Sequence, residues 1–130
     1  MAVEPVEHRI EILRHTMIGL VRRHGPDQSA RQLGVFLTCY LEEEAQTVRG
    51  LAAKLNVSKP AITRALDRLS EFDLVRRKTD PLDRRSVLVQ RTVVGAGFMR
   101  DLKKINGDAE AKTQTAAMRE GRTRAPVGAM

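Results

Sequence analysis

The chain has 130 residues, of which 42% are hydrophobic, and a formal net charge of +7. This is the length of one ordinary domain, and the apolar fraction is large enough to form a core. No apolar run approaches the roughly 20 residues of a membrane span, no secretory leader is recognisable, and one cysteine excludes a disulfide framework or a cysteine-rich zinc site. We therefore expect a cytoplasmic protein that is stabilised by helix packing.

The positive charge is concentrated in the middle of the chain. Residues 1–45 carry 5 basic and 7 acidic side chains (−2), residues 46–105 carry 14 and 6 (+8), and residues 106–130 carry 4 and 3 (+1). A localised positive excess is typical of a surface that binds a polyanion. The middle segment therefore indicates a nucleic acid partner, and charge alone leaves DNA and RNA open.

The first predicted element is an amphipathic helix at residues 5–24. Pro5 suits its first turn, and Gly25 followed by Pro26 ends it. Apolar residues recur with spacings of four and three, as in a seam between helices: Val6, Ile10, Leu13, Met17 and Leu20. Such a helix is about 30 Å long, more than a small domain covers. We predict that it contributes to a dimer interface; a helix packed in the core of its own chain is the alternative.

Three more helices are predicted before residue 73. Ser29 and Gln32 form a capping-box pattern at the start of one, and Thr47 suits the N-cap of the next. The last spans residues 58–72, with Ser58 as its cap and Pro60 in its first turn. Its apolar stripe faces away from a polar, mainly basic stripe of Lys59, Thr63, Arg64, Asp67 and Arg68. Two short helices joined by a tight turn predict a helix-turn-helix, although a merely solvated basic face explains this pattern equally well.

A β-hairpin is predicted directly after this helix. Residues 74–78 and 86–90 have the composition of strands, and residues 79–85 form a polar loop between them. The loop ends in a basic tip formed by Asp83, Arg84 and Arg85, in which the carboxylate can orient a guanidinium. A helix for the major groove followed by a basic ribbon for the minor groove is a far more specific arrangement than either alone, and it favours DNA.

A resemblance to a known family rests on four strings: VSKPAITRALDRL (57–69), LVRR (74–77), DPLDRRS (80–86) and TVVG (92–95). Between residues 47 and 98 the chain resembles the MarR (multiple-antibiotic-resistance regulator) family of winged-helix transcription factors. The resemblance implies a homodimer that binds a pseudo-palindromic operator in double-stranded DNA, usually as a repressor, and often releases it when a small phenolic ligand or an oxidant reaches the protein.

The same resemblance implies roles for individual residues. Ser58, Thr63, Arg64 and Arg68 are expected to face bases and phosphates, and Arg85 is expected to enter the minor groove, positioned by Asp83. Three further cations and donors complete the candidate DNA-binding set: Lys59, Arg77 and Arg84. The expected fold is α+β and mostly α: a winged helix-turn-helix with a three-helix core and a two-stranded wing, plus an N-terminal dimerisation helix.

Two residues depart from the family's pattern, and the C-terminal segment has no good match to the family's long dimerisation helices. Asp73 stands where a glycine is usual, and we expect it to adopt the left-handed conformation with little strain. Arg91 replaces an apolar residue, which either costs some packing or adds a phosphate contact. A helix from about residue 94 to 105 meets Asn106-Gly107. We therefore predict a domain at residues 1–105, a flexible or partly helical tail at residues 106–130, and dimerisation mainly through residues 5–24.

Other functions are less well supported by the residues. The chain shows no paired catalytic carboxylates, no nucleophile beside a base and no phosphate-binding glycine loop, so we expect neither an enzyme nor a cofactor, and leave a small-molecule effector open. Cys39 is expected to be a buried packing residue rather than an oxidant sensor, and His8 and His15 solvated rather than metal ligands. The competing class is a winged-helix module that binds a protein, or DNA without operator specificity.

Overall fold

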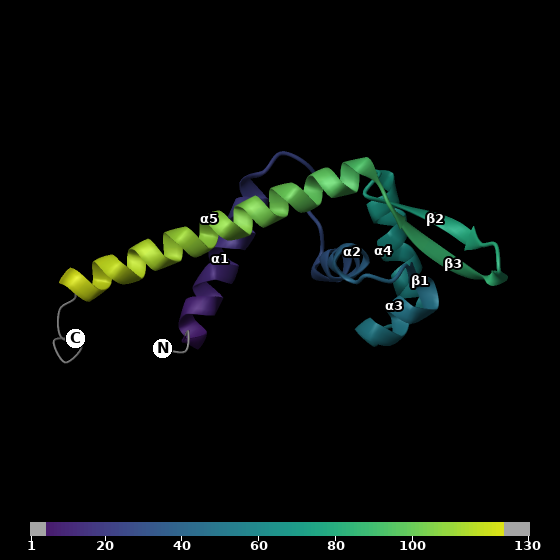
Figure 1. The fold of residues 1–130 in the computed structure, drawn as a ribbon, viewed down its shortest axis with the longest axis horizontal. Helices are drawn as coiled ribbons and strands as arrows, with labels where there is room; N and C mark the ends of the chain where they lie inside the picture. Colours follow the sequence, from purple (N-terminus) through teal and green to yellow (C-terminus); the bar gives the residue numbers. More distant parts are fainter. Residues whose placement is uncertain (1–4, 124–130) are drawn as a thin grey trace. The chain divides into compact units, whose positions relative to one another are not determined.

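The computed structural model describes residues 5–123, with side chains to residue 119 (Figure 1). These residues form two compact units. One comprises residues 28–100, and the other, the helical unit, combines the described parts of residues 1–27 and 101–130. Within the described residues, no helix is long and apolar enough to cross a membrane.

The first unit is built on three helices, α2 (Ala30–Leu41), α3 (Val48–Leu55) and α4 (Lys59–Glu71). The capping box of α2 is present, since the Ser29 hydroxyl accepts from the N–H of Gln32 and the Gln32 side chain accepts from the N–H of Ser29. At the starts of α3 and α4, the hydroxyl of Thr47 accepts from the N–H of Gly50 and the hydroxyl of Ser58 accepts from the N–H of Ala61. The three predicted caps are therefore confirmed, because each depends only on residues within one turn of the chain.

Two non-glycine residues with left-handed backbone follow α3 and α4. Asn56, with φ of 54°, ends α3 and allows the tight turn into α4. Asp73, with φ of 56°, follows α4 at the position where the family usually has glycine. Asn and Asp tolerate this conformation better than other side chains. The expectation that Asp73 preserves the turn is thus confirmed.

The core of this unit lies between the helices and the strands that follow them. Its fully buried large side chains come from α2, α3, α4 and β2: Val35, Phe36, Leu51, Ile62, Leu66, Leu69 and Val75. Burying one such side chain contributes about 1.5–3 kcal/mol. The ring of Phe36 lies at the centre, with its centroid 4.4 Å from that of Tyr40 and 5.0 Å from that of Phe98. This core holds the basic face of α4 outward.

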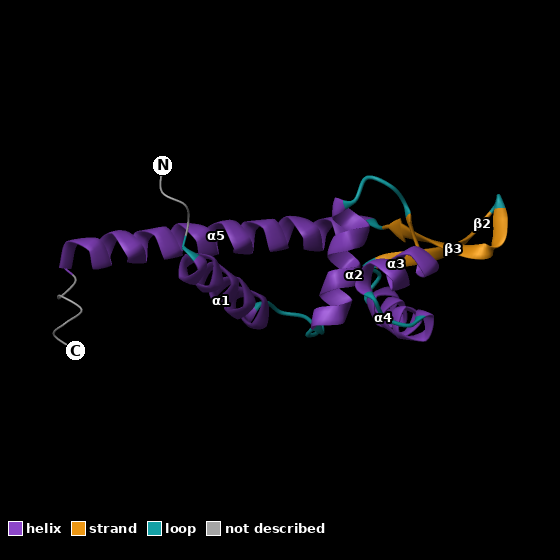
Figure 2. Ribbon diagram, turned by 90° about the horizontal axis from the view of Figure 1, so that it is seen from below, coloured by secondary structure: helices purple, strands orange, loops and turns teal. Residues whose placement is uncertain are grey.

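The sheet has three antiparallel strands, β1 (Gln46–Thr47), β2 (Val75–Asp80) and β3 (Asp83–Arg91), in the order β1-β3-β2. Figure 2 shows β2 and β3 in orange. The sequence did not predict β1, because two residues carry no recognisable alternation. The predicted loop at residues 79–85 is also wrong: only residues 81–82 lie between the strands, and pairing extends to Asp80 opposite Asp83. The Asp80 carboxylate accepts from the N–H of Leu82 at 2.9 Å and stabilises this tight turn.

The helical unit contains α1 (Val6–Arg22) and the part of α5 (Val93–Thr123) that begins at residue 101. The two helices approach closely at Gly19, where an added Cβ would lie 2.5 Å from Cγ2 of Ile105. Polar contacts flank this crossing. The Asn106 amide donates to the hydroxyl of the buried Thr16 at 3.1 Å, and Arg23 forms an ion pair with Asp101 at 2.9 Å.

Helix α5 extends well beyond the predicted end near residue 105. Asn106 and Gly107 lie inside it, and residues 106–123 are helical. A glycine inside a helix costs only about 1 kcal/mol, and tertiary contacts offset this: Asn106 bonds to α1, and Ala109 and Thr113 are buried. The division into a domain of 1–105 and a tail stays a prediction, and residues 124–130 lie outside the described residues.

Candidate nucleic-acid interface

Helix α4 presents its polar face to solvent over its first two turns. Ser58, Lys59, Thr63 and Arg64 are all exposed, whereas Ile62, Ala65 and Leu66 on the opposite face are buried. The Ser58 hydroxyl is engaged as the N-cap, since it accepts from the N–H of Ala61 at 3.2 Å. Among the described residues no ion pair holds the guanidinium of Arg64. Its donors are therefore available to a ligand.

A basic groove lies between α3, α4 and the wing strands. It has a volume of about 260 Å³. Five predicted DNA-binding residues line it, namely Lys59, Thr63, Arg77, Asp83 and Arg85, together with Thr47, Val48, Arg49, Ser86 and Val87. Ser58, Arg64, Arg68 and Arg84 are not among its lining residues. The structure thus brings the N-terminal half of α4 and the wing together around one cationic depression.

Asp83 positions Arg85 differently from the sequence prediction. Its carboxylate accepts from the backbone N–H of Arg85 at 3.1 Å, and no ion pair with the guanidinium of Arg84 or Arg85 is present among the described residues. Both arginines lie in β3 rather than in a loop, and both are exposed. The carboxylate therefore fixes the backbone at the tip of the wing and leaves the guanidinium groups available.

Two other predicted cations are already engaged within the protein. Arg77 forms an ion pair with Asp67, with 2.7 Å between Nη2 and Oδ1, and this joins β2 to α4. Arg68 pairs with Glu71 at 3.0 Å and its guanidinium lies 4.6 Å from the ring centroid of Phe72. Such exposed pairs contribute at most about 1 kcal/mol. Their geometric effect matters more, because they restrict where each guanidinium points.

Sequence reasoning missed Arg49 and the role of Arg91. Arg49 lies on α3 and lines the basic groove; its only signal was the positive charge of residues 46–105. Arg91 donates to the carbonyls of Cys39 at 2.9 Å and Glu42 at 2.7 Å, at the end of α2. Helix C-terminal carbonyls lack partners within the helix, so Arg91 satisfies them. This role was not predicted from the sequence, and the alternative of a phosphate contact by Arg91 stays a prediction.

Residues that suggested other chemistry have ordinary roles. Cys39 is 5% exposed, and burial raises its pKa to about 11, although Arg91 and Lys54 act in the opposite direction. A neutral, buried thiol is a poor oxidant sensor, which favours the packing role. His15 lies 3.6 Å from the carboxylate of Glu11. Among the described residues, no group of three or more His, Cys, Asp or Glu side chains is placed to hold a metal ion.

A helix-turn-helix, a following β-hairpin and a basic groove between them define a winged helix-turn-helix protein. Residues 30–87 match the model of the MarR family. This match lies within the winged-helix unit, and it confirms the resemblance found in the sequence. Proteins of this family are transcriptional regulators and not enzymes.

Solved structures share the fold of this chain. Wild-type MarR from E. coli has 26% sequence identity and a TM-score of 0.65, with 88% of this chain and 87% of that chain covered. The transcriptional regulator Tm0710 from Thermotoga maritima has 18% identity, a TM-score of 0.64 and coverage of 85% and 72%. YusO from Bacillus subtilis has 18% identity, a TM-score of 0.62 and coverage of 92% and 86%. No curated protein sequence matches the chain. The predicted fold class, α+β and mostly helical with a wing, is confirmed.

Proposed function

We propose that the chain is a sequence-specific regulator of transcription, acting as a repressor, that binds a pseudo-palindromic operator in double-stranded DNA. Helix α4, with its cap at residue 58, reads the major groove, and the wing at residues 79–86 enters the adjacent minor groove. The single observation that carries the proposal is the basic groove, because it combines an exposed helix face and a basic ribbon in one surface.

The exposed face of α4 has the chemistry that major-groove reading requires. The groove is about 12 Å wide and admits a helix. Thr63 and Arg64 are exposed and lie next to each other in the second turn of α4. An arginine can bond to the O6 and N7 atoms of a guanine, and a threonine can contact a thymine methyl group. This pair is the proposed source of base preference.

The wing supplies positive charge for the minor groove. Arg84 and Arg85 are exposed at the start of β3, next to the turn at residues 81–82. Narrow minor grooves concentrate negative potential and attract arginine. We assign backbone contacts to Lys59 and Arg77, which line the basic groove, and to the newly recognised Arg49.

The proposed homodimer rests on the surface of α1. Four of the five residues in its predicted seam, Val6, Ile10, Leu13 and Met17, are 42–61% exposed. A contiguous apolar stripe on an otherwise charged helix is typical of a helix-helix interface. Two protomers would place two α4 helices in successive major grooves, about 34 Å apart, which matches an operator with two half-sites.

A gel-shift experiment tests this function. The purified protein is titrated against DNA from its own promoter region, with random competitor, at two salt concentrations, while the mass of the complex is measured. We expect a competitor-resistant complex with two protomers whose affinity falls steeply with salt, because phosphate contacts release counterions. Binding that the competitor abolishes would favour an architectural role. If the protein binds no DNA and instead binds a protein partner with weak salt dependence, the alternative of a protein-interaction module would be favoured.

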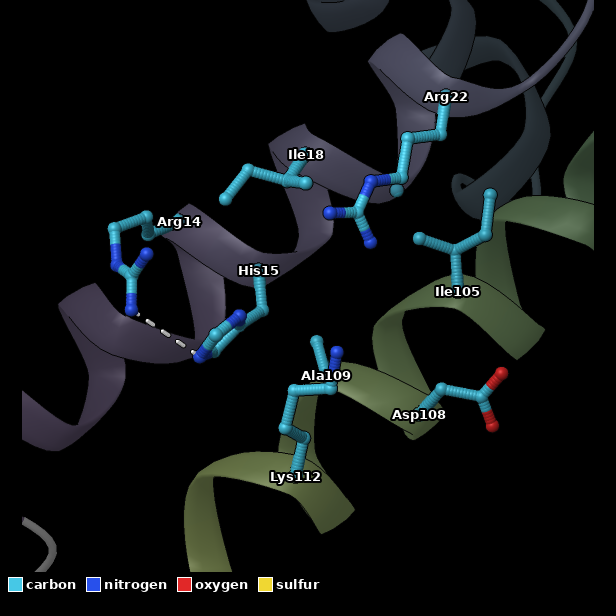
Figure 3. A pocket seen from close by; sticks show the side chains of 9 residues that line it. Arg14, His15, Ile18, Arg22, Ile105, Asp108, Ala109 and Lys112 are labelled. Atoms are coloured by element: carbon cyan, nitrogen blue, oxygen red, sulfur yellow. Dashed lines mark hydrogen bonds between the residues drawn. The ribbon is translucent and has the colours of Figure 1, made fainter. Parts of the chain in front are cut away.

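A second candidate function, an effector-gated regulator, is favoured by a pocket of about 280 Å³ within the helical unit (Figure 3). Arg22 of α1 and Lys112 of α5 extend toward the same space, and neither has an ion-pair partner among the described residues. Ile18 and Ile105 add apolar walls. Cations beside apolar side chains suit a small organic anion, and we propose such an effector for this pocket.

Calorimetry with benzoate as the probe tests the effector site. We expect Arg22→Gln and Lys112→Gln each to weaken benzoate binding about tenfold or more, because each removes a charge-assisted hydrogen bond. Lys104→Gln is the matched control, since this exposed lysine of α5 does not line the pocket. Operator affinity without benzoate should stay unchanged in all three variants. Equal benzoate binding by the wild type and both pocket variants would refute the site.

A further inference from the structure

One phenolic hydroxyl connects both ends of the wing. Tyr40 lies in the last turn of α2, and its hydroxyl donates to the carbonyl of Leu74 at 2.6 Å. The same hydroxyl accepts from the N–H of Thr92 at 3.0 Å. Leu74 immediately precedes β2 and Thr92 immediately follows β3. The two hydrogen bonds therefore close the hairpin at its root and attach it to α2.

Tyr40 is itself held in place by its neighbours. Its ring stacks on the fully buried Phe36. On the strand side, the guanidinium of Arg91 donates to the carbonyls of Cys39 and Glu42 and lies 5.7 Å from the Tyr40 ring centroid. The last residue of β3 is thus bonded to the same turn of α2 that carries the phenol. Packing on Phe36 therefore holds the Tyr40 ring, and hydrogen bonds hold the Arg91 guanidinium beside it.

The start of α5 is shaped to leave room for the hydroxyl. A Cβ at Gly95 would overlap the Tyr40 oxygen and would crowd the Leu74 carbonyl. The N–H of Gly95 donates to the Thr92 hydroxyl at 2.8 Å, and this hydroxyl donates to the carbonyl of Asp73 at 2.5 Å. Polar backbone groups on both sides of the hairpin root are therefore paired through two side-chain oxygens, those of Tyr40 and Thr92.

We propose that Tyr40 is a positioning residue for DNA binding: its hydroxyl sets the direction in which the wing presents Arg84 and Arg85, without touching DNA itself. The inference rests on the proposed function. β2 has six residues, so the turn lies about 20 Å from the root at about 3.3 Å per residue. A rotation of about 10° at the root would move the turn by about 3 Å, which exceeds the tolerance of about 0.5 Å for a preorganised binding group.

Removal of the hydroxyl alone separates positioning from packing. Tyr40→Phe keeps the ring on Phe36 but leaves the Leu74 carbonyl and the Thr92 N–H without their partner. We expect this variant to remain folded and to lose about tenfold in operator affinity, because two hydrogen bonds at the root are lost. Thr38→Val is the matched control: its hydroxyl lies in the same helix and bonds within α2, to the carbonyl of Gly34 at 2.7 Å. We expect less than a twofold change for the control.

A double-mutant cycle identifies the route of the effect. If Tyr40 acts through the wing, Tyr40→Phe should cost less than about twofold in a background that carries both Arg84→Ala and Arg85→Ala, where the wing contacts are already lost. Tyr40→Phe should still lower operator affinity about tenfold in the Arg64→Ala background, because the contact of Arg64 is made by α4 and not by the wing. Equal, additive losses in both backgrounds would show general damage and overturn the inference.

Hydrogen exchange provides a readout that does not require DNA. We expect the amides of residues 75–92 to exchange faster in Tyr40→Phe than in the wild type, while those of α4 keep their protection. Unchanged exchange in the wing would overturn the inference even if the operator affinity fell. A wild-type protein that binds no operator would refute the proposed function, and exchange would still decide whether Tyr40 holds the wing.

Discussion

The two compact units differ in what they leave exposed. The unit of residues 28–100 buries a large apolar core around Phe36 and Leu66 and exposes cations. The helical unit exposes large apolar residues of α1 instead, while its buried residues, among those described, are few and mostly small: Thr16, Leu102, Ala109 and Thr113. A unit with a closed core can present a fixed charged surface. A unit with an exposed apolar stripe can bury that stripe against another protomer. The comparison is consistent with the proposed DNA-binding role of the first unit and the proposed dimerisation through the second.

The largest expected effect comes from disrupting the apolar stripe of α1, which forms the proposed dimer interface. We expect Ile10→Asp with Leu13→Asp to convert the dimer to a monomer, because two charges would be buried in the seam. Operator affinity should then fall by about 100-fold or more, since the two half-sites would no longer be bound together. Sedimentation and gel shift measure both changes on the same samples.

The control for this double variant is Arg9→Asp, which changes the charge of α1 outside the apolar stripe. It should leave the protein dimeric. A double variant that stays dimeric and binds the operator normally would contradict the assignment of α1 to the interface.

The second largest effect tests the packing of the unit of residues 28–100, which we call the closed unit. We expect Gly95→Ala to lower the free energy of unfolding by about 1–3 kcal/mol, because its Cβ has no space beside Tyr40 and the Leu74 carbonyl. Gly97→Ala is the matched control two residues further along α5, where the nearest side-chain atom is 3.6 Å away. The control should be neutral or stabilising by up to about 1 kcal/mol, as alanine favours a helix. Urea denaturation measures both; a Gly95→Ala protein as stable as the wild type would show that the packing at this point is loose.

The closed unit could be predicted largely from local signals. The starts of α2, α3 and α4 depend on Ser29, Thr47 and Ser58, which act within one turn of the chain. The wing was predicted from its strand composition, but the short length of its turn was not, because pairing of Asp80 with Asp83 is decided by the hairpin as a whole. Elements with strong local signals are therefore predictable even when their exact ends are not.

The remaining features depend on residues far apart in the sequence. Tyr40 meets Leu74 and Thr92 across 34 and 52 residues, and no spacing rule connects them. The continuation of α5 through Gly107 is likewise supported by the contact of Asn106 with Thr16, 90 residues away. In the candidate site, α4 and the wing arginines were predictable from their motifs, whereas Arg49 joins them only through tertiary packing.

The third prediction distinguishes the two parts of the DNA-binding surface. Arg64→Ala should cost about 1–3 kcal/mol on the operator and should change base preference, because we propose that its guanidinium bonds to base edges. Arg85→Ala should weaken binding to all sequences more uniformly, because it acts through the potential of the minor groove. Titration of an operator panel with single base changes measures both effects. Unchanged affinity in both variants would refute the assignment of this surface to DNA.

The smallest expected effect concerns Cys39, which lies in the closed unit. Because burial raises its pKa to about 11, almost none of the thiol is ionised at neutral pH, and thiolate is the form that oxidants attack. We expect hydrogen peroxide at pH 7 to leave operator affinity unchanged, and Cys39→Ser to behave like the wild type. Operator release on oxidation that Cys39→Ser abolishes would instead make this residue a sensor.

The raised pKa of Cys39 also sets the sign of a pH effect. A raised pKa means that the folded state holds the proton more tightly than the unfolded state, so this group's contribution to stability is fully present below the unfolded-state pKa of 9.0 and is lost as the pH rises toward about 11. Cys39→Ala removes the group. The loss of stability between pH 9 and 11 should therefore be smaller in this variant than in the wild type, as measured by urea denaturation across that range. Identical slopes would show that the thiol is more accessible to water than its burial indicates.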